Sequence, residues 1–331
     1  MRRAYGVGLL SALLFGAGAP LAKMLLASSG PLALSGLFYL GACGLTLIVP
    51  RRSEAKLSRA DLPWLLGAIV AGGALAPALL LFGLSHSTAA TASLLLNLEA
   101  PFTILLAVFF FGEHLSRREA IGAALVVAGG ALLGLPYRDF RGGVLVAAAC
   151  FFWAIDNNCS ARLALKDPAQ VLRMKAFFAG SANLLLGLFV AGERAANVGA
   201  ALLVGAICYG ASLLLYLHAQ RELGAARQAA LFAAAPFVGV LISVLLGESL
   251  TPSHGAAALL MAFGVTQLLR ARHAHLHTHA ALEHEHLHVH DEHHQHAHAG
   301  PVSEPHSHQH HHESLTHDHP HVSDAHHKHR H

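Results

Sequence analysis

One acidic residue stands in the middle of a long apolar stretch of this chain. Glu99 lies twelve residues into the apolar segment 88–111, and Pro101 follows two positions later. An ionised group at the centre of a bilayer costs about 2.5–3.5 kcal/mol to insert, and a proline there interrupts the backbone hydrogen bonds of a helix. We therefore predict that Glu99 binds a proton or a cation. The alternative is a carboxyl group that only holds a neighbouring helix.

A second polar cluster lies near the end of the apolar segment 142–161. Asp156, Asn157 and Asn158 follow one another there. Three consecutive residues of a helix span about 200° around its axis, so they cannot all face the same way. We predict that one of them faces a solute path while the others hold neighbouring helices. The alternative is a polar contact between helices with no ligand.

Three further polar residues lie inside apolar segments. Asn97 is close to Glu99, and Asn183 lies midway along the segment 171–191. Each amide either joins two helices or contacts a ligand, and helix contact is the more common use. Lys23 lies in the outer part of the first segment, where it either attracts an anionic group or extends to the membrane surface.

Histidine is concentrated at the end of the chain, where 24 of the 28 histidines fall within residues 273–331. Neutral imidazole is a good ligand for nickel, zinc, copper and cobalt. The polar composition predicts a segment that is disordered without metal and holds several weak, exchangeable metal sites. A pH-responsive polycation and an inert extension are the alternatives. The predicted ligands are His275, His277, His279, His284, His286, His288, His290, His293, His294, His296, His298, His306, His308, His310, His311, His312, His317, His319 and His321.

The rest of the chain is strongly apolar, with 54% hydrophobic and only 12% charged residues. A soluble domain carries about 25% charged residues, and a membrane-spanning helix needs about 20 apolar ones. We predict an all-α polytopic membrane protein, because backbone groups in lipid must bond within their own helix. The ten predicted transmembrane segments are 4–27, 31–49, 62–83, 88–111, 118–135, 142–161, 171–191, 198–217, 224–246 and 253–270.

The chain repeats itself with an offset of 135 residues. Pro101 and Glu113 in EAPFTILLAVFFFGEHLS correspond to Pro236 and Glu248 in AAPFVGVLISVLLGESLT. We predict that both prolines kink their helices and that each glutamate caps the helix that follows it. This period is too long for a solenoid, and paired halves in an apolar chain are typical of secondary transporters. The predicted domains are two five-helix repeats and a tail, 1–136, 137–272 and 273–331.

The placement of basic residues predicts the orientation in the membrane. With the N-terminus in the cytoplasm, sixteen lysines and arginines fall on the inner side and four on the outer side. Because each half has an odd number of helices, the second half must insert upside down. Arg117 and Arg118 follow the first repeat motif, and Pro252 and Ser253 take their places after the second. Both termini are therefore predicted to be cytoplasmic.

The first repeat motif resembles the signature of the EamA family of the drug/metabolite transporter superfamily. The matching residues include Leu98, Glu99, Gly112, Glu113 and Gly129, with Ala100 inserted before Pro101. The resemblance implies proton-coupled or exchange transport, frequently efflux, and no enzyme activity. The segment 153–184 is similar to a subgroup that also carries a histidine-rich C-terminus.

Taken together, these features predict a secondary active transporter that exports a small solute across the cytoplasmic membrane and carries a cytoplasmic, metal-binding tail. A divalent metal exporter for nickel, cobalt or zinc is the first alternative. A membrane-anchored metal buffer or sensor is the second. We expect no catalytic residues, no required cofactor and no nucleic-acid partner. The expected partners are the lipid bilayer and a small-molecule or metal-ion substrate, and a homodimer is compatible with the sequence.

Overall fold

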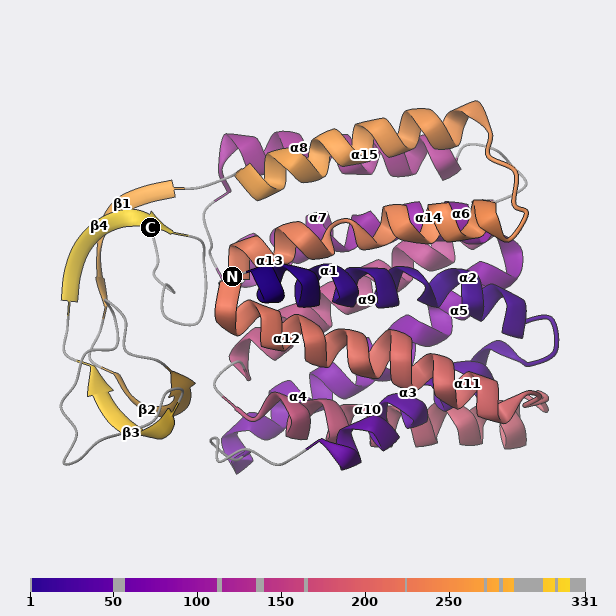
Figure 1. Ribbon diagram of the computed structural model, residues 1–331, viewed down its shortest axis with the longest axis horizontal. Helices are drawn as coiled ribbons and strands as arrows, with labels where there is room; N and C mark the ends of the chain where they lie inside the picture. The colour runs from indigo at the N-terminus through magenta and orange to yellow at the C-terminus, as the bar shows by residue number, and fades with distance from the viewer. Residues whose placement is uncertain are drawn as a thin grey trace.

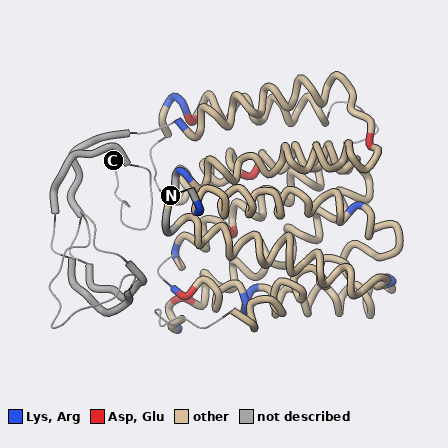
Figure 2. Tube along the Cα trace, viewed as in Figure 1, with Lys and Arg blue, Asp and Glu red and all other residues tan. Residues whose placement is uncertain are grey.

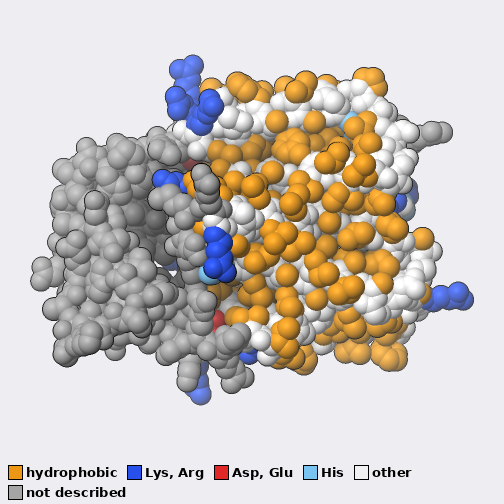
Figure 3. Space-filling model, in the orientation of Figure 1, with side chains coloured by type: hydrophobic (Ala, Val, Ile, Leu, Met, Phe, Trp, Pro, Cys, Tyr) orange, Lys and Arg blue, Asp and Glu red, His pale blue; other side chains and the backbone are white. Residues whose placement is uncertain are grey.

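The computed structural model of the chain is a bundle of long helices, followed by a short region of strands (Figure 1). It describes residues 2–49, 57–111, 115–134, 140–163, 166–223, 225–270, 273–279, 282–288, 306–312 and 315–321. Apolar side chains cover the face of the bundle that Figure 3 shows, and large ones such as Phe109, Phe189 and Leu259 are exposed. Such a surface suits lipid. The prediction of an all-α polytopic membrane protein is confirmed for the bundle.

The first half of the bundle consists of helical segments that follow one another with few breaks. Several predicted spans are built from two or three shorter elements. The elements are α1 (Arg2–Gly16), α2 (Gly18–Leu25), α3 (Pro31–Ile48), η1 (Arg59–Asp61), α4 (Leu62–Ala68), η2 (Ile69–Leu75), α5 (Ala76–His86), α6 (Ala89–Leu95), η3 (Leu96–Leu98), α7 (Glu99–Phe111) and α8 (Arg117–Gly134).

The second half repeats this order of segments. Its elements are α9 (Phe140–Arg162), α10 (Pro168–Leu185), η4 (Leu186–Val190), α11 (Val198–Val204), η5 (Gly205–Ala211), α12 (Ser212–Leu223), α13 (Ala225–Phe232), α14 (Ala235–Leu245) and α15 (Pro252–Arg270).

Eight helical stretches among the described residues are long and apolar enough to cross a membrane. They correspond to eight of the ten predicted segments. The other two segments form α8 and α15, helices of 18 and 19 residues. These two helices lie side by side at one edge of the bundle (Figure 1) and pack along each other. In the described residues, each of the ten predicted segments therefore has a helical counterpart, although α8 and α15 are not among the eight stretches long and apolar enough to cross a membrane.

Equivalent helices of the two halves run antiparallel, as inverted repeats require. In the pair α8 and α15, the Arg118 side chain at the start of one donates to the carbonyl of Arg270 at the end of the other. In the pair α3 and α10, Gly36 lies against the backbone of Gly180 and Leu184. Small residues at such crossings let helix backbones approach closely. The packing thus places two similar halves upside down relative to each other.

A π-helical turn occurs at matching places in the two repeats. The π-helical segment η2 of the first half and η5 of the second half each contain seven residues. Their first residues, Ile69 and Gly205, are 136 positions apart, one more than the offset of the repeat motif. A π turn widens the helix by one residue and disturbs its regular hydrogen bonds, often at functional sites. Both repeats therefore carry an irregular third helix.

Basic side chains gather at the end of the bundle where the N-terminus lies, at the left of Figure 2. Lys23 and Arg194 lie at the opposite end. Two of the residues counted on the inner side lie well within a predicted span. Arg173 and Lys175 fall in the predicted segment 171–191 and belong to α10, and Arg173 donates to the carbonyl of Thr46 at 2.6 Å.

In the parts of the tail that the structure describes, the backbone forms strands. Strand β1 (His273–His279) pairs antiparallel with β4 (Leu315–His321), and β2 (Leu282–His288) pairs antiparallel with β3 (His306–His312). Histidine alternates with other residues in much of this region, and a period of two residues is that of a strand. The predicted ligands His290, His293, His294, His296 and His298 lie outside the described residues.

Candidate functional site

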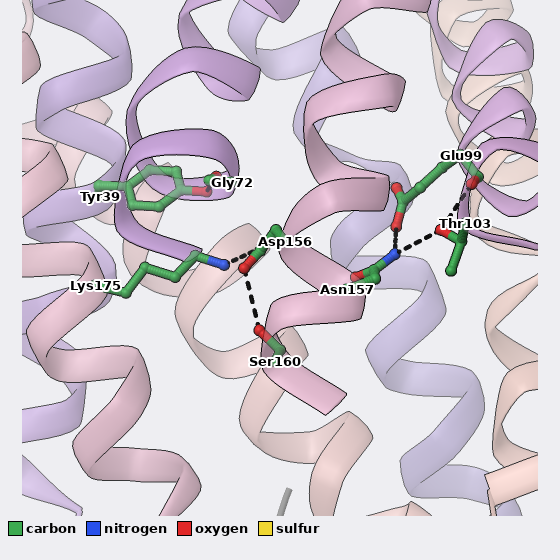
Figure 4. A network of polar contacts seen from close by, with 8 residues as sticks. All are labelled: Tyr39, Gly72, Glu99, Thr103, Asp156, Asn157, Ser160 and Lys175. Carbon is green, nitrogen blue, oxygen red and sulfur yellow. Dashed lines mark hydrogen bonds and ion pairs between the residues drawn. The ribbon is translucent and has the colours of Figure 1, made fainter. Parts of the chain in front are cut away.

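A network of polar side chains lies between the helices of the bundle (Figure 4). Glu99 starts α7 and stands midway along the 22-residue span Ala89–Phe110. Its carboxylate accepts a hydrogen bond of 2.7 Å from the side-chain amide of Asn157 in α9. The same amide reaches the hydroxyl of Thr103 at 3.2 Å, and Thr103 donates to the backbone carbonyl of Glu99 at 2.9 Å. Glu99 is therefore held between α7 and α9.

Glu99 also faces the second half of the bundle. It is half-buried, and Asn157 beside it is exposed. The partner of its carboxylate, Asn157, belongs to α9, the first helix of that half. A side chain at this depth that is neither fully buried nor in an ion pair among the described residues can exchange a proton or meet a solute.

Asp156 belongs to a separate part of the network. Its carboxylate forms an ion pair with Lys175 of α10 and accepts a hydrogen bond of 3.1 Å from Ser160. Both charged side chains of the pair are largely buried. A buried charge is tolerated when it is paired and hydrogen-bonded. Asp156 is thus neutralised, unlike Glu99.

The neighbours Asp156 and Asn157 point to different helices, as Figure 4 shows. Successive residues of a helix are about 100° apart, so Asp156 turns toward α10 while Asn157 turns toward α7. Asn158 donates to the carbonyl of Thr103 at 3.3 Å and to that of Ala154 at 2.9 Å. Each of the three side chains thus contacts a neighbouring helix, and that one of them faces a solute path stays a prediction.

The π turn η2 is part of the same region. The Tyr39 hydroxyl of α3 donates to the carbonyl of Gly72 at 2.6 Å. The amide of Asn183 donates to the carbonyl of Ala74 at 2.9 Å and to the Ser35 hydroxyl at 3.0 Å. A π turn leaves carbonyl groups without their regular partners, and these two side chains satisfy two of them. Asn183 therefore joins three helical elements.

Two predicted site residues lie apart from this network. The Lys23 ammonium donates to the carbonyls of Leu84 and Ser87 at 2.6 and 2.9 Å, at the end of α5. A cation is favourable at a helix C-terminus, so Lys23 closes that helix end. The amide of Asn97 donates to the carbonyl of Leu94 at 3.0 Å and lies 3.8 Å from the sulfur of Met261. It contacts α15.

The two repeat prolines lie just after breaks in their helices. Pro101 is the third residue of α7, directly after the 3₁₀ turn η3. Pro236 is the second residue of α14, which follows a turn at Ala233 and Ala234. Proline suits the first turn of a helix, where its missing N–H is not needed. The predicted interruptions are therefore present as restarts of the helix.

Glu248 corrects the prediction that the repeat glutamates cap the helices that follow them. Its two carboxylate oxygens accept hydrogen bonds of 2.8 and 2.9 Å from the backbone N–H groups of Ala89 and Ala90. These residues start α6 in the other half of the chain. The sequence offered no signal for this pairing, because it depends on how the halves pack. Glu113 lies outside the described residues.

Tyr39 and Lys175 are members of the network that sequence reasoning missed. Lys175 lies five residues inside the predicted segment 171–191, so its depth was a usable signal. The predicted metal ligands in β1 to β4 are described only by their backbone. Elsewhere in the described part of the chain, three or more His, Cys, Asp or Glu side chains are nowhere grouped as a metal site would require.

Comparison with known proteins places this network in a known architecture. The model of the EamA-like transporter family matches residues 2–135 and again 140–270. The chain belongs to the EamA-like transporter family. It is 31% identical over 297 residues to a protein of Methanothermobacter thermautotrophicus described as an uncharacterized transporter, covering 80% of this chain and 86% of that protein. This EamA-like chain is thus a membrane transporter of small solutes by family.

A solved crystal structure has the same fold. It aligns with a TM-score of 0.58 and 19% sequence identity, and the alignment covers 81% of this chain and 99% of that one. At this identity the likeness concerns the fold alone. The network of Glu99, Asn157, Asp156 and Lys175 is therefore described from this EamA-like protein's own contacts.

Proposed function

We propose that this protein is a secondary active transporter that exports a small solute across the cytoplasmic membrane, with Glu99 as the group that binds the coupling proton or cation. The observation that carries the proposal is the position of Glu99. It lies midway along a membrane span, half-buried, and its carboxylate contacts α9 of the other half. Secondary transporters place their sites at this depth between inverted halves.

The partners of Glu99 suit a group that changes its protonation state. The Asn157 amide donates to the ionised carboxylate. An amide can also turn to present its oxygen to a protonated carboxyl group. Asp156 is less suited to this role, because Lys175 already compensates its charge.

The distribution of basic residues supports the proposed orientation. Basic residues gather at the end of the bundle where the N-terminus lies (Figure 2), and Arg118 at the start of α8 lies beside Arg270 at the end of α15. Cytoplasmic loops carry an excess of lysine and arginine. Both the N-terminus and the end of α15 lie at this end (Figure 1), so we place the termini and the tail in the cytoplasm.

The proposal is tested in proteoliposomes that contain the full chain. A screen of radiolabelled solutes, with and without nickel, cobalt and zinc, first identifies the substrate. In Glu99→Gln, which keeps the size of the side chain and one acceptor oxygen, uptake driven by a proton gradient falls at least about tenfold. Glu119→Gln is the matched control, because Glu119 accepts from the backbone N–H of Ser116 at the start of α8, away from the network. Coupled flux at the wild-type level in Glu99→Gln contradicts the proposal.

Divalent metal export is a second candidate, and the histidine-rich tail favours it. We propose that residues 273–331 bind nickel, zinc, cobalt or copper in the cytoplasm, since imidazole is their preferred nitrogen ligand. In the first candidate this binding regulates transport of another solute; in the second it captures the cargo. Metal flux in the same screen, reduced by removal of the tail, favours the second candidate.

A further inference from the structure

The two ends of the bundle are closed to different extents. At the end opposite the N-terminus, which we name the loop end because it holds residues 26–30 and 246–251, α6 packs on α14 and α2 packs on α5 and α6. The repeat makes α13 the counterpart of α6 and α7 the counterpart of α14. Comparable packing between α13 and α7 is missing in the described residues. The two inverted halves therefore pack closely at the loop end, through α6 and α14. At the other end, the equivalent packing between α13 and α7 is not formed in the described residues.

The joined end is held by a carboxylate from the second half. Glu248 accepts from the N–H groups of Ala89 and Ala90, which are the first two residues of the helical span Ala89–Phe110. Thr88 accepts from the N–H of Thr91 at 3.1 Å. The first N–H groups of a helix have no partner within it, and a negative charge beside them is favourable. Glu248 therefore supplies two bonds that the first half cannot make for itself.

The surrounding contacts depend on the same approach of α6 to α14. Ser93 is 1% exposed and lies so close to Gly239 that a Cβ atom there would be 2.5 Å from its hydroxyl oxygen. His254 of α15 contacts the Thr91 hydroxyl at 2.9 Å. If α6 moves away from α14, the bonds of Glu248 and these contacts are lost together.

A second carboxylate at the loop end provides a contrast. Glu193 accepts from the N–H of Ala33 at 2.8 Å, so it also caps a helix of the other half. That helix, α3, packs along α10 from Gly36, beside Leu184, to Thr46, beside Arg173. Helices α3 and α10 are equivalent in the two halves and contact each other along this whole length. The inverted arrangement therefore offers no second way of packing them. Glu193 thus belongs to a fixed part of the bundle.

We propose that Glu248 is a latch that holds the loop end shut and releases the N-terminus of α6 when this end opens. The proposal rests on the proposed transport function, because alternating access requires each end to open in turn. In the second state the two halves exchange roles, so that α7 approaches α13 as α14 now approaches α6. Glu248 acts as a positioning residue and touches neither the solute nor Glu99.

The test measures access to the loop end without any solute. Cys43, Cys150, Cys159 and Cys208 are first replaced by serine or alanine in the full chain. Ala90→Cys, at a position 1% exposed, then reports on the interface in proteoliposomes treated with a membrane-impermeant maleimide. We expect Glu248→Ala to raise the labelling rate about tenfold, the effect of losing charge-assisted hydrogen bonds. Glu193→Ala is the matched control and leaves the rate within about twofold.

Two outcomes overturn the latch. One is an unchanged labelling rate in Glu248→Ala; the other is equal acceleration by Glu193→Ala, which indicates general loosening. A second reporter, Ala179→Cys, lies buried between α3 and α10 and shows whether the bundle is folded. If Ala179→Cys is also labelled in the Glu248→Ala variant, the experiment is repeated with Glu248→Gln and is judged by the same two outcomes. Because labelling needs no substrate, failure of the latch and failure of the proposed transport are separate results.

Discussion

The ammonium group of Lys175 forms an ion pair with the carboxylate of Asp156, nineteen residues earlier in the chain and one helix away. This pairing divides the acidic residues of the network into two kinds. Asp156 is compensated inside the bundle. The carboxylate of Glu99 accepts a hydrogen bond from the amide of Asn157, and in the described residues it forms no ion pair. The carboxylate of Glu99 is thus the one expected to respond to protons.

Removing one member of the buried pair should destabilise the bundle strongly. Lys175→Met leaves Asp156 charged and unpaired with its side chain 7% exposed, which costs about 3–5 kcal/mol. The double variant Asp156→Asn with Lys175→Met should recover most of this loss. Thermal unfolding in detergent measures both. Lys166→Met is the control, because it breaks the more exposed pair with Asp61 and costs about 1 kcal/mol or less. Equal losses of stability in Lys175→Met and Lys166→Met would show that the buried ion pair contributes no more than the exposed one.

The π turn of the third helix should depend on one hydroxyl group. Tyr39→Phe keeps the ring but leaves the carbonyl of Gly72 without its 2.6 Å partner. An unsatisfied buried acceptor costs about 1–3 kcal/mol, so the unfolding midpoint should fall. Tyr5→Phe, on an exposed ring in α1, should change stability by no more than about 0.5 kcal/mol. Identical midpoints for the two variants would refute a role for this bond.

A single methyl group should separate two helices of opposite halves. A Cβ atom at Gly41 of α3 would lie 2.1 Å from the carbonyl oxygen of Leu202 in α11. Because backbone cannot give way easily, Gly41→Ala should cost about 1–3 kcal/mol. At Gly44, one turn further along the same helix, no atom lies within 4 Å of an added Cβ. Gly44→Ala should therefore be at least as stable as the wild type in the same unfolding assay, because alanine favours a helix more than glycine does. A loss of stability at both positions would contradict close approach as the cause of the loss at Gly41.

The tail should account for most metal binding by the full chain. Deletion of residues 273–331 should abolish most high-capacity nickel and zinc binding in calorimetry while leaving the helical circular dichroism of the bundle. Binding to the intact chain should weaken as the pH falls through about 6.5, because protons compete for imidazole nitrogens. His86→Ala, at an isolated exposed histidine, serves as the control and should bind as the wild type does. Undiminished binding after the deletion would place the sites elsewhere.

Sequence patterns predicted much of the architecture, since its causes are local. Apolar length indicated the spans, and the 135-residue offset together with the odd helix number indicated inversion. Glu99 and the cluster at Asp156 were recognisable because a polar residue at such depth is costly. The partners were harder to predict. Lys175 was not recognised as a member of the network, and Glu248 was assigned to the wrong helix.

The errors have one physical origin. The partner of Glu248 is 158 residues away in the chain, and that of Asn183 is 109 residues away. Such contacts depend on the rotation and depth of each helix, which hydropathy does not determine.

The helix caps that cross between the halves have a consequence for the making of the protein. Helices α3 and α6 of the first half begin with N–H groups that donate to the carboxylates of Glu193 and Glu248, far later in the chain. A ribosome delivers the first half into the membrane well before these residues emerge. In the newly inserted first half, the first N–H groups of α3 and α6 therefore lack their carboxylate partners. Insertion of the second half supplies these partners and completes the folding of both halves.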